Sequence, residues 1–213
     1  CELQALAEKM GIREIAYKGD KAGHKVDSSS DSIYRNPNKC IMCRRCETMC
    51  NEVQTVGTLG GLNRGFDAIV SPAFNLPLAD SSCTFCGQCV AVCPTGAIVE
   101  VDATARVFKE IKNPRKHLVV QVAPSIRVAI GELFGMEPGE VTTGKLVTAL
   151  RKLGFDTVFD TDFSADLTVM EEASELVDRI QNDKTMPILT SCCPAWVRFI
   201  EMNYPDMLDI PSS

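Results

Sequence analysis

The sequence predicts an α+β module rich in cysteine over residues 36–103, followed by an α/β domain with parallel strands over residues 117–213. Three observations support this prediction. Eight of the eleven cysteines fall into two regularly spaced runs in the first part. From residue 117 onward, β-rich segments alternate with helical ones, which is typical of parallel sheets with crossover helices. The length of 213 residues and the hydrophobic content of 45% suit two domains.

The segment before the cysteine-rich module, residues 1–35, is expected to contain one short helix and a linker. Apolar residues at helical spacing over positions 1–11 predict the helix, and Gly11 ends it. The polar stretch 18–32, which includes three consecutive serines, is typical of a linker.

Each cysteine run has the form C-x2-C-x2-C-x3-C, and Pro94 follows the second run. Two residues between ligands allow three thiolates of one loop to reach three irons of the same 4Fe-4S cube, whereas the fourth thiolate points to the other cube. The spacing therefore predicts a ferredoxin-like module that holds two 4Fe-4S clusters with crossed ligation. The expected ligands are Cys40, Cys43, Cys46 and Cys93 for the first cluster, and Cys83, Cys86, Cys89 and Cys50 for the second.

Other uses of these cysteines fit the pattern less well. Structural zinc sites use four ligands in two C-x2-C pairs, which leaves no role for the third and fourth cysteine of each run. Disulfide frameworks are typical of small secreted domains, whereas this chain has 213 residues and a normal apolar fraction.

A Gly-rich segment, residues 56–65, lies between the two runs and resembles a phosphate-binding loop in composition only. No helical pattern follows it, so a hairpin is expected instead of a nucleotide site. Residues 104–116 are expected to link the module to the second domain.

The second domain is expected to alternate strands and helices. Gly154 is a predicted helix end, and Pro194 suits the first position of the last helix, which carries Trp196. The expected elements are a strand at 117–122, a helix to 133, a helix at 143–153, a strand at 155–160, a long helix to 180, a strand at 186–189 and a final helix.

Ligands of such sheets bind beyond the carboxyl ends of the strands. Three segments in these positions are therefore expected to converge on one pocket. They are residues 123–125, 160–165 and 191–194.

Two adjacent cysteines, Cys192 and Cys193, precede the last helix. A helix N-terminus favours thiolate through its dipole and its free N–H groups. Adjacent residues point in different directions, so one thiol could bind a metal while the other does different work. The alternative is a pair of small buried residues, since free cysteine also packs as a hydrophobe.

The long helix has an apolar stripe over positions 169–180, with Glu172, Glu175 and Arg179 along its flank. Such a charged row is usually a solvated face. Beside a buried redox centre, carboxylates at this spacing could instead pass protons, because burial raises their pKa toward neutrality.

The net charge of −6 disfavours nucleic acid as a partner, because nucleic-acid-binding surfaces are strongly basic. No apolar run approaches the roughly 18 residues of a membrane span, and no signal-peptide pattern is found. Many thiols together with iron-sulfur chemistry lead us to expect a reducing cytoplasm.

Several separate motifs resemble the FeFe hydrogenases. The Gly-rich segment and the first cysteine run are most similar to the large subunit of multimeric, NAD(P)-linked or electron-bifurcating enzymes. The motifs that carry the resemblance are the two cysteine runs, Ala123-Pro124-Ser125, Gly131-Glu132-Leu133-Phe134, Met170-Glu171-Glu172-Ala173 and Thr190-Ser191-Cys192-Cys193-Pro194.

The resemblance implies roles for individual residues. Cys193 would be a ligand of the 4Fe-4S part of the H-cluster, and Cys192 would pass protons to and from the di-iron part. Cys1 would be the last ligand of an accessory cluster. Two further sets are implied: Glu172, Glu175 and Arg179 as the proton path, and Ala123, Pro124 and Ser125 as the lining of the di-iron pocket.

The resemblance also implies three further H-cluster cysteines beyond the position of Ser213. A four-iron cube cannot be held by Cys193 alone, so the chain as given is expected to lack a complete H-cluster. The two histidines, His24 and His117, do not occupy the matching ligand position and are interpreted as structural.

The sequence thus predicts an oxidoreductase subunit for reversible oxidation of H2, with iron-sulfur or flavin subunits and ferredoxin as partners. One alternative is a pure electron-transfer protein, whose second domain would serve only for docking. The other is a non-catalytic relative, such as a hydrogen sensor or an iron-sulfur assembly factor. The presence of Cys192 disfavours both alternatives.

Overall fold

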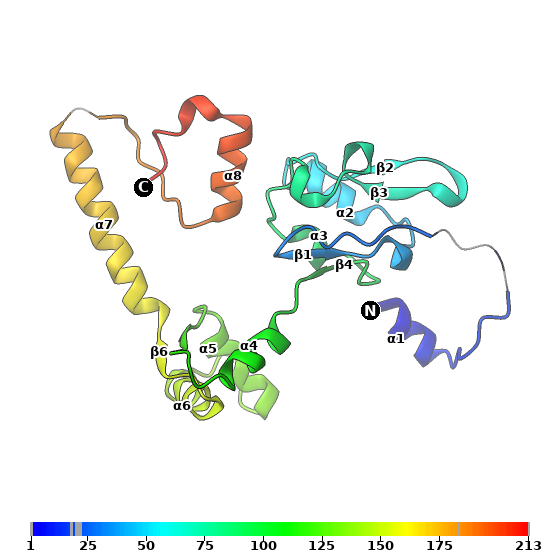
Figure 1. Ribbon diagram of the computed structural model, residues 1–213, viewed down its shortest axis with the longest axis horizontal. Helices are drawn as coiled ribbons and strands as arrows, with labels where there is room; N and C mark the ends of the chain where they lie inside the picture. Colours follow the sequence, from blue (N-terminus) through cyan, green and yellow to red (C-terminus); the bar gives the residue numbers. More distant parts are fainter. Residues whose placement is uncertain (1, 18, 20–22, 183, 213) are drawn as a thin grey trace. The chain divides into compact units, whose positions relative to one another are not determined.

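The computed structural model describes residues 2–17, 19, 23–182 and 184–212 (Figure 1). The chain forms two compact units. Unit 1 comprises Cys1–Val101 and Ser191–Pro211, and unit 2 comprises Asp102–Thr190 together with Ser212. The last helix therefore belongs with the cysteine-rich module, although about ninety residues separate the two in sequence.

Unit 1 is built from short elements around two antiparallel strand pairs, β1 with β4 and β2 with β3. The second pair confirms that the Gly-rich segment forms a hairpin, with Gly60 opposite Ser71. The elements are α1 (Glu2–Lys9), β1 (Ile33–Arg35), α2 (Arg45–Thr48), β2 (Gly60–Leu62), β3 (Ile69–Ser71), α3 (Gln88–Ala91), β4 (Ile98–Glu100) and α8 (Pro194–Asn203).

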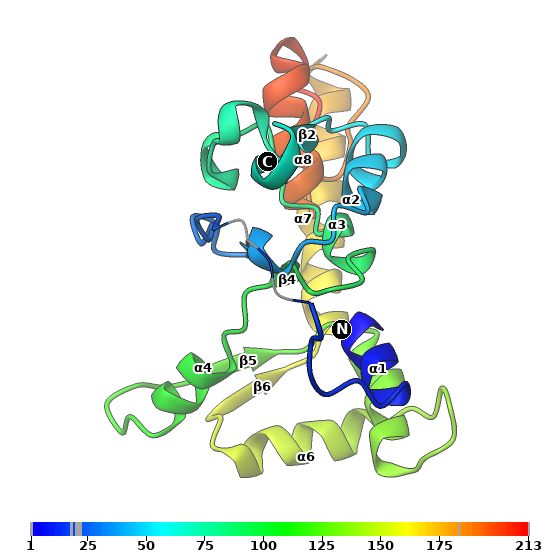
Figure 2. The same cartoon turned by 90° about the vertical axis from the view of Figure 1, so that its right-hand side faces the viewer.

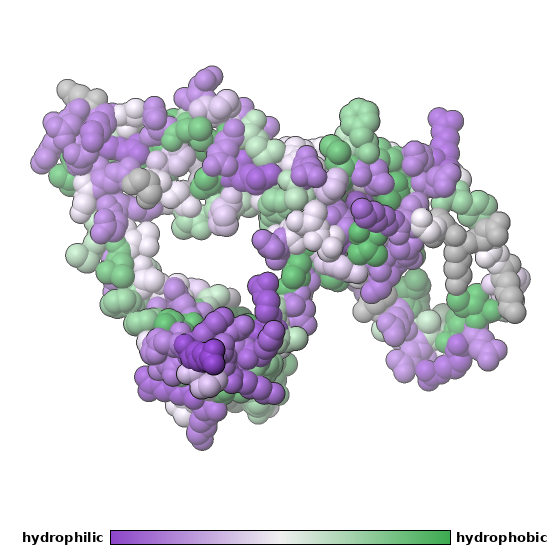
Figure 3. Space-filling view, in the orientation of Figure 1, coloured by the Kyte–Doolittle hydropathy of each residue, from purple (hydrophilic) through white to green (hydrophobic). Residues whose placement is uncertain are grey.

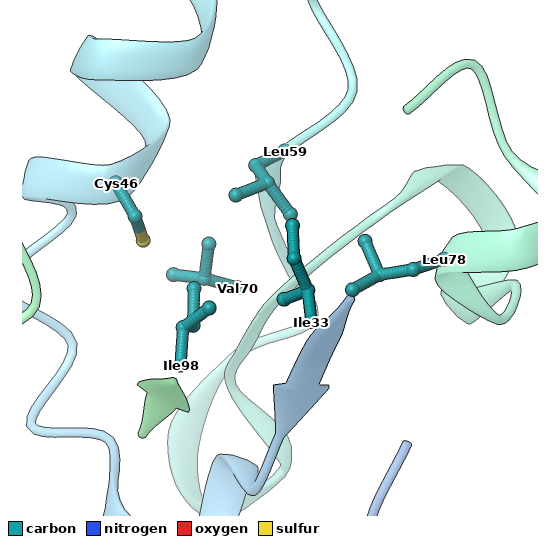
Figure 4. Close-up of a cluster of buried hydrophobic side chains, with 6 residues drawn as sticks. All are labelled: Ile33, Cys46, Leu59, Val70, Leu78 and Ile98. Carbon is teal, nitrogen blue, oxygen red and sulfur yellow. The ribbon is translucent and has the colours of Figure 1, made fainter. Parts of the chain in front are cut away.

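The core of unit 1 is small and includes a thiol (Figure 4). Cys46 lies among aliphatic side chains. Eight partly buried hydrophobic or thiol side chains of the two cysteine runs, two of them valines, pack against this core. A module with so little apolar core needs an additional source of stability, such as metal clusters. The buried members are Ile33, Cys46, Leu59, Val70, Leu78 and Ile98.

The expected linker at 18–32 is partly wrong. Asp27 and Ser30 are buried, and Asp27 exchanges two backbone hydrogen bonds with Arg35. The Asp27 carboxylate also accepts from Leu78 N at 2.9 Å. Polarity alone suggested a solvated segment, but these side chains satisfy buried backbone groups of the module. The folded module therefore begins before residue 36.

Unit 2 contains one parallel strand pair, β5 (Val119–Gln121) and β6 (Thr157–Phe159), which confirms the parallel arrangement. Figure 2 shows the two strands side by side, with α6 next to β6. The helices of unit 2 are α4 (Thr104–Ile111), α5 (Ile126–Ala129), α6 (Thr143–Leu153) and α7 (Thr161–Gln181).

Two expectations for unit 2 are wrong. Residues 104–111 are helical instead of forming a linker, because Val107, Phe108 and Ile111 recur at helical spacing and the Asp102 carboxylate caps Thr104 N. The expected strand at 186–189 forms no named strand among the described residues. Pro187 has no N–H to donate to a ladder, and Leu189 O instead accepts from Ser212 N at 2.7 Å.

The long helix α7 exposes much of its apolar stripe (Figure 3). Val169 is 65% exposed, and Ile180 is 62% exposed. Asp160 begins the helix by accepting a hydrogen bond from Phe163 N at 2.9 Å. No helix of the described residues is long and apolar enough to cross a membrane.

Candidate metal centres

The first metal-site candidate in unit 1 is a cavity whose lining mixes the two cysteine runs. Three of its thiols come from the first run, and Cys93 comes from the second. Arg35 and Arg44 lie in the same wall. The cysteines that line this cavity are Cys40, Cys43, Cys46 and Cys93.

A second cavity is lined by the remaining four cysteines of the two runs. Three of its thiols come from the second run, and Cys50 comes from the first. Cys50 lies on the π-helical turn Met49–Val53 that continues α2. The pitch of the helix thus changes between Cys46 and Cys50, and the two thiols serve different cavities. The cysteines that line the second cavity are Cys50, Cys83, Cys86 and Cys89.

The two ligand loops repeat one backbone conformation. Met42 and Phe85, which occupy equivalent positions in the runs, have φ of 57° and 58°. Arg44 and Gly87, two positions later, have φ of 60° and 74°. Met42 N donates to Cys40 Sγ at 3.3 Å, and the equivalent bond in the second loop is 3.4 Å long. Left-handed backbone at bulky residues is costly and marks functional sites.

Burial raises the pKa of four of the thiols that line the two cavities, Cys40, Cys46, Cys83 and Cys89. Burial, reinforced by neighbouring thiols, raises the pKa of Cys46 to about 11 and that of Cys89 to about 12. Burial alone would also raise the pKa of Cys93, but hydrogen bonds from Ile98 and Thr95 lower it overall. Iron binding must therefore displace protons from the more buried cysteines.

The arrangement suits clusters better than single ions. Among the described residues, no group of three or more His, Cys, Asp or Glu side chains could hold one metal ion. The thiols surround a space instead of converging on a point. Arg35 Nε supplies a further test, because it is buried in the first cavity's wall without a hydrogen-bond partner among the described residues. Sulfur atoms of a bound cluster would be acceptors for this donor.

Cys193 is the N-cap residue of α8, and Pro194 is the first residue of that helix, as the sequence predicts. Both Cys192 and Cys193 are exposed free thiols, so they are not a buried packing pair. Farther along α8, Arg198 Nε donates to Cys83 O at 2.8 Å. The Arg198 guanidinium also lies 5.0 Å from the centre of the Phe85 ring. The helix that begins at Cys193 is thereby fixed to the loop of the second cavity.

The charged row on α7 is only partly connected. Arg179 is buried and pairs with Glu175, with Nη2 and Oε1 2.5 Å apart, and its Nη1 donates to Thr185 O at 3.2 Å. Glu172 instead accepts a hydrogen bond from Ser212 Oγ at 2.8 Å. The sequence pattern did not indicate Ser212, because a single serine forty residues from Glu172 has no recognisable spacing.

Two of the three segments expected to form one pocket meet in unit 2. A cavity there is lined by Ala123 and Pro124 together with Asp160 and Thr161. Thr161 Oγ1 donates to Val122 O and joins the two segments. Residues 191–194 belong to unit 1, so the convergence of all three segments stays a prediction.

Other predicted residues lie as follows. Ser125 is exposed just before α5 and is not among the residues that line this cavity. His117 Nε2 is 3.0 Å from Thr157 Oγ1, and His24 N donates to Asn38, so both histidine positions have local structural contacts. Cys1 lies outside the described residues.

Two family matches cover these sites. Residues 116–213 match the family described as the iron-only hydrogenase large subunit, C-terminal domain. Residues 79–99, which contain all four cysteines of the second run, match the 4Fe-4S binding domain.

Individual proteins are similar over longer stretches. The NADP-reducing hydrogenase subunit HndD of Solidesulfovibrio fructosivorans is 58% identical over 219 residues, which covers 100% of this chain and 37% of that protein. Iron hydrogenase 1 of Clostridium pasteurianum is 44% identical over 188 residues, covering 88% of this chain and 33% of that protein. The solved structure of apo [FeFe]-hydrogenase HydA1 from Chlamydomonas reinhardtii shares 45% identity over 53% of this chain and 30% of that one, with a TM-score of 0.48.

The chain spans about a third of the length of these hydrogenases. The similarity to HndD extends over the whole of this chain, and the hydrogenase family match covers most of unit 2 and all of α8. The resemblance inferred from the motifs is thus confirmed, and the chain belongs to the iron-only hydrogenase large-subunit family.

Proposed function

We propose that the chain provides the electron relay and part of the active-site domain of an enzyme that reversibly oxidises H2 to protons and electrons. The observation that carries the proposal is the distribution of cysteines over two cavities, each with three thiols from one run and one from the other. Four thiolates per cavity are the donor set of a 4Fe-4S cluster. The names of the similar proteins, both hydrogenases, support the same function.

Crossed ligation is part of this proposal. The first cluster would be held by the cysteines of the first cavity, and the second cluster by those of the second. Arg198, on the helix that begins at Cys193, donates to the loop of the second cavity. We therefore assign the second cluster to the end of the relay nearer the active site, and the first cluster to the outer end.

Cys193 is proposed to hold the 4Fe-4S part of an H-cluster, and Cys192 to carry protons beside it. When bound, that group supplies the chemistry that splits H2. Cys193 is exposed at the N-terminus of α8. It offers one of the four ligands that a cube requires. Ala123, Pro124 and Ser125 are proposed to line the di-iron pocket.

The proton route is proposed to run along α7. Glu172 can accept and release a proton, and the Ser212 hydroxyl that donates to it can do both at once, which extends the route. Glu175 and Arg179 form a close ion pair at the other end of the row. Arginine keeps its charge at all relevant pH values, so Arg179 would hold Glu175 ionised and orient it.

The remaining assignments follow from the relatives. HndD is named as a subunit of an NADP-reducing hydrogenase, which supports other subunits as partners. The partners proposed are iron-sulfur or flavin subunits and ferredoxin. A cytoplasmic location fits the many free thiols of the described residues. Cys1 is proposed to contribute to a further cluster.

Metal analysis of the chain, reconstituted without oxygen, tests the relay. Two cubes require about eight irons and eight sulfides per chain. Cys50→Ser should remove the cluster of Cys83, Cys86 and Cys89 while the other survives. Cys43→Ser should do the reverse, and Cys192→Ser, which changes no ligand of the relay, should keep both. Loss of the first cluster in Cys50→Ser would contradict crossed ligation, and a total near four irons would contradict two clusters.

The active-site roles of the adjacent cysteines can be separated in the complete subunit with its cofactors loaded. Cys193→Ser should reduce the iron content of the active-site cube, because a hydroxyl is a poor substitute for thiolate. Cys192→Ser should keep the iron and lose most hydrogen turnover, because a hydroxyl is a much weaker acid than a thiol. The opposite pattern would reverse the assignment.

A further inference from the structure

A buried arginine lies in the wall of the first cavity. Arg35 is the last residue of β1 and is only 4% exposed. Its Nη1 donates to Val70 O at 2.9 Å, which fixes the guanidinium against β3. Arginine does not lose its proton in proteins. A permanent positive charge is therefore held beside Cys40 and Cys46, which line the same cavity.

The counter-charge to Arg35 is incomplete. Asp27 is also buried, but its Oδ2 is 3.5 Å from Arg35 Nη2, which is long for a charged hydrogen bond. The carboxylate is mainly committed to other donors. Its Oδ1 accepts from Ser29 Oγ at 2.7 Å, and its Oδ2 accepts from Leu78 N at 2.9 Å. Part of the field of Arg35 thus remains available to the cavity.

The third nitrogen of Arg35 is also available. Nε is buried and has no hydrogen-bond partner among the described residues. Buried donors of native proteins are nearly always satisfied, so an unpaired one indicates a missing acceptor. Four thiols line the cavity beside it, and sulfur accepts hydrogen bonds from N–H groups in iron-sulfur proteins.

We propose that Arg35 is a positioning residue for the first cluster. Its Nε donates a hydrogen bond to a sulfur of this cluster, and its positive charge raises the reduction potential of the cluster. The proposal rests on the two-cluster function given above. A reduced cube carries one more negative charge than an oxidised one, so a fixed cation and a donor both favour the reduced form. The outer end of the relay then holds electrons more firmly, which favours electron flow away from Cys193.

Redox titration followed by electron paramagnetic resonance, on the reconstituted 213-residue chain, tests this. Arg35→Gln should lower the equilibrium constant for reduction of the first cluster at least tenfold, a fall of about 59 mV for one electron. Arg35→Lys, which keeps the charge but has no Nε donor, should show a smaller fall. Asp27→Asn should raise the equilibrium constant for reduction of the first cluster about threefold, which is an upward shift of about 28 mV in its reduction potential.

Matched variants identify the cluster and the cause. The signals of the two clusters are assigned from Cys43→Ser and Cys86→Ser, each of which removes one of them. Arg45→Gln is the charge control: Arg45 precedes Cys46 but its side chain is 59% exposed. Solvent and salt should screen the charge of Arg45, so the equilibrium constant for reduction of the first cluster should change by no more than about twofold in this variant.

The outcomes separate the inference from the function on which it rests. Fewer than eight irons in the unaltered chain would refute the two-cluster function itself. Eight irons together with an Arg35→Gln shift no larger than that of Arg45→Gln would refute the role of Arg35 alone. If Arg35→Gln fails to assemble, Asp27→Asn decides, and an unchanged or lowered potential in that variant overturns the proposal.

Discussion

Single residues tie distant parts of the chain together in unit 2. Ser212 is buried, donates its hydroxyl hydrogen to Glu172, and donates its N–H to Leu189 O at 2.7 Å. One residue near the end of the described chain thus reaches both α7 and the segment that follows it. Within the charged row, Glu172 accepts a hydrogen bond from the neutral hydroxyl of Ser212, whereas Glu175 pairs with the cationic Arg179.

Glu172→Gln should therefore slow hydrogen turnover in the complete, loaded enzyme by about 10²–10⁴-fold while leaving the iron content unchanged. An amide can keep the hydrogen bond from Ser212 but cannot relay a proton at neutral pH. Glu171→Gln is the control, because Glu171 is an exposed neighbour on the same helix. Hydrogen evolution and iron content are measured on the same samples. Equal rates in the two variants would remove Glu172 from the route.

Asp162 gives unit 2 a pH-dependent contact that involves no metal. A hydrogen bond from Arg127, 2.5 Å away, holds the pKa of this carboxyl below its ordinary value and links α5 to α7. A lowered folded-state pKa contributes stability above the unfolded-state value of about 3.9, and that contribution is lost as the pH falls through the lower folded-state value.

The thermal midpoint of the helical circular dichroism signal should thus be higher in the unaltered chain than in Asp162→Asn at pH 7. The difference should shrink as the pH falls below about 3.9 and should vanish below the folded-state pKa, where the Asp162 carboxyl is neutral in both the folded and the unfolded chain. The contact is exposed, so added salt should also shrink the difference. Asp166→Asn, on the same helix and without an ion pair among the described residues, should show no such pH dependence. A difference that does not shrink at all as the pH falls from about 7 through about 3.9 into the acid range would contradict this account.

At the scale of elements, local signals set helix ends well and strand partners poorly. The sequence predicted α6 at its observed limits, because Gly154 adopts a φ of 112° that ends the helix. The expected strand at 186–189 failed because strand formation depends on a partner, which local composition does not reveal. For the same reason the sequence did not predict β1, which pairs with β4, a segment more than sixty residues away.

Gly154→Ala should destabilise unit 2 by about 1–3 kcal/mol. The new Cβ would need a left-handed backbone and would lie 2.9 Å from Ile111 Cγ2 of α4. Gly144→Ala in the same helix is the matched control, because no atom lies within 4 Å of its Cβ and its φ is ordinary. That change should stabilise by about 0.5 kcal/mol through helix propensity. Denaturant unfolding measures both, and a similar sign for the two would contradict the role of Gly154.

At the scale of the whole molecule, the two units are expected to depend on metal differently. The core of unit 1 has six buried members, one of which is Cys46, and eight other side chains of the runs pack beside it. Unit 2 has none of these cysteines. The sequence predicted which cysteines line each cavity, since their spacing is local, but not that α8 belongs to unit 1. That assignment rests on Arg198 and the loop of Cys83, more than a hundred residues apart.

Removal of iron by a chelator should therefore unfold unit 1 and leave unit 2 folded. Cluster binding energy is also folding energy where the core is small. Limited proteolysis should then cut rapidly within residues 27–101, while α6 and α7 keep their protection in hydrogen exchange. A chain that keeps the same protease resistance in unit 1 after iron loss would show that its apolar core suffices. Cys192→Ser, treated in the same way, controls for chelation of surface thiols.

The discontinuity of unit 1 also orders events during synthesis on the ribosome. All eight cysteines of the two runs are made by residue 93, but Arg198 follows 105 residues later, after residues 102–190 of unit 2. At typical elongation rates of 5–20 residues per second, this gap lasts roughly 5–20 s. For that interval the loop of Cys83 has no α8 against it, and iron delivery can reach it from the side that α8 later covers. A nascent chain would thus accept its clusters before the active-site helix closes over them.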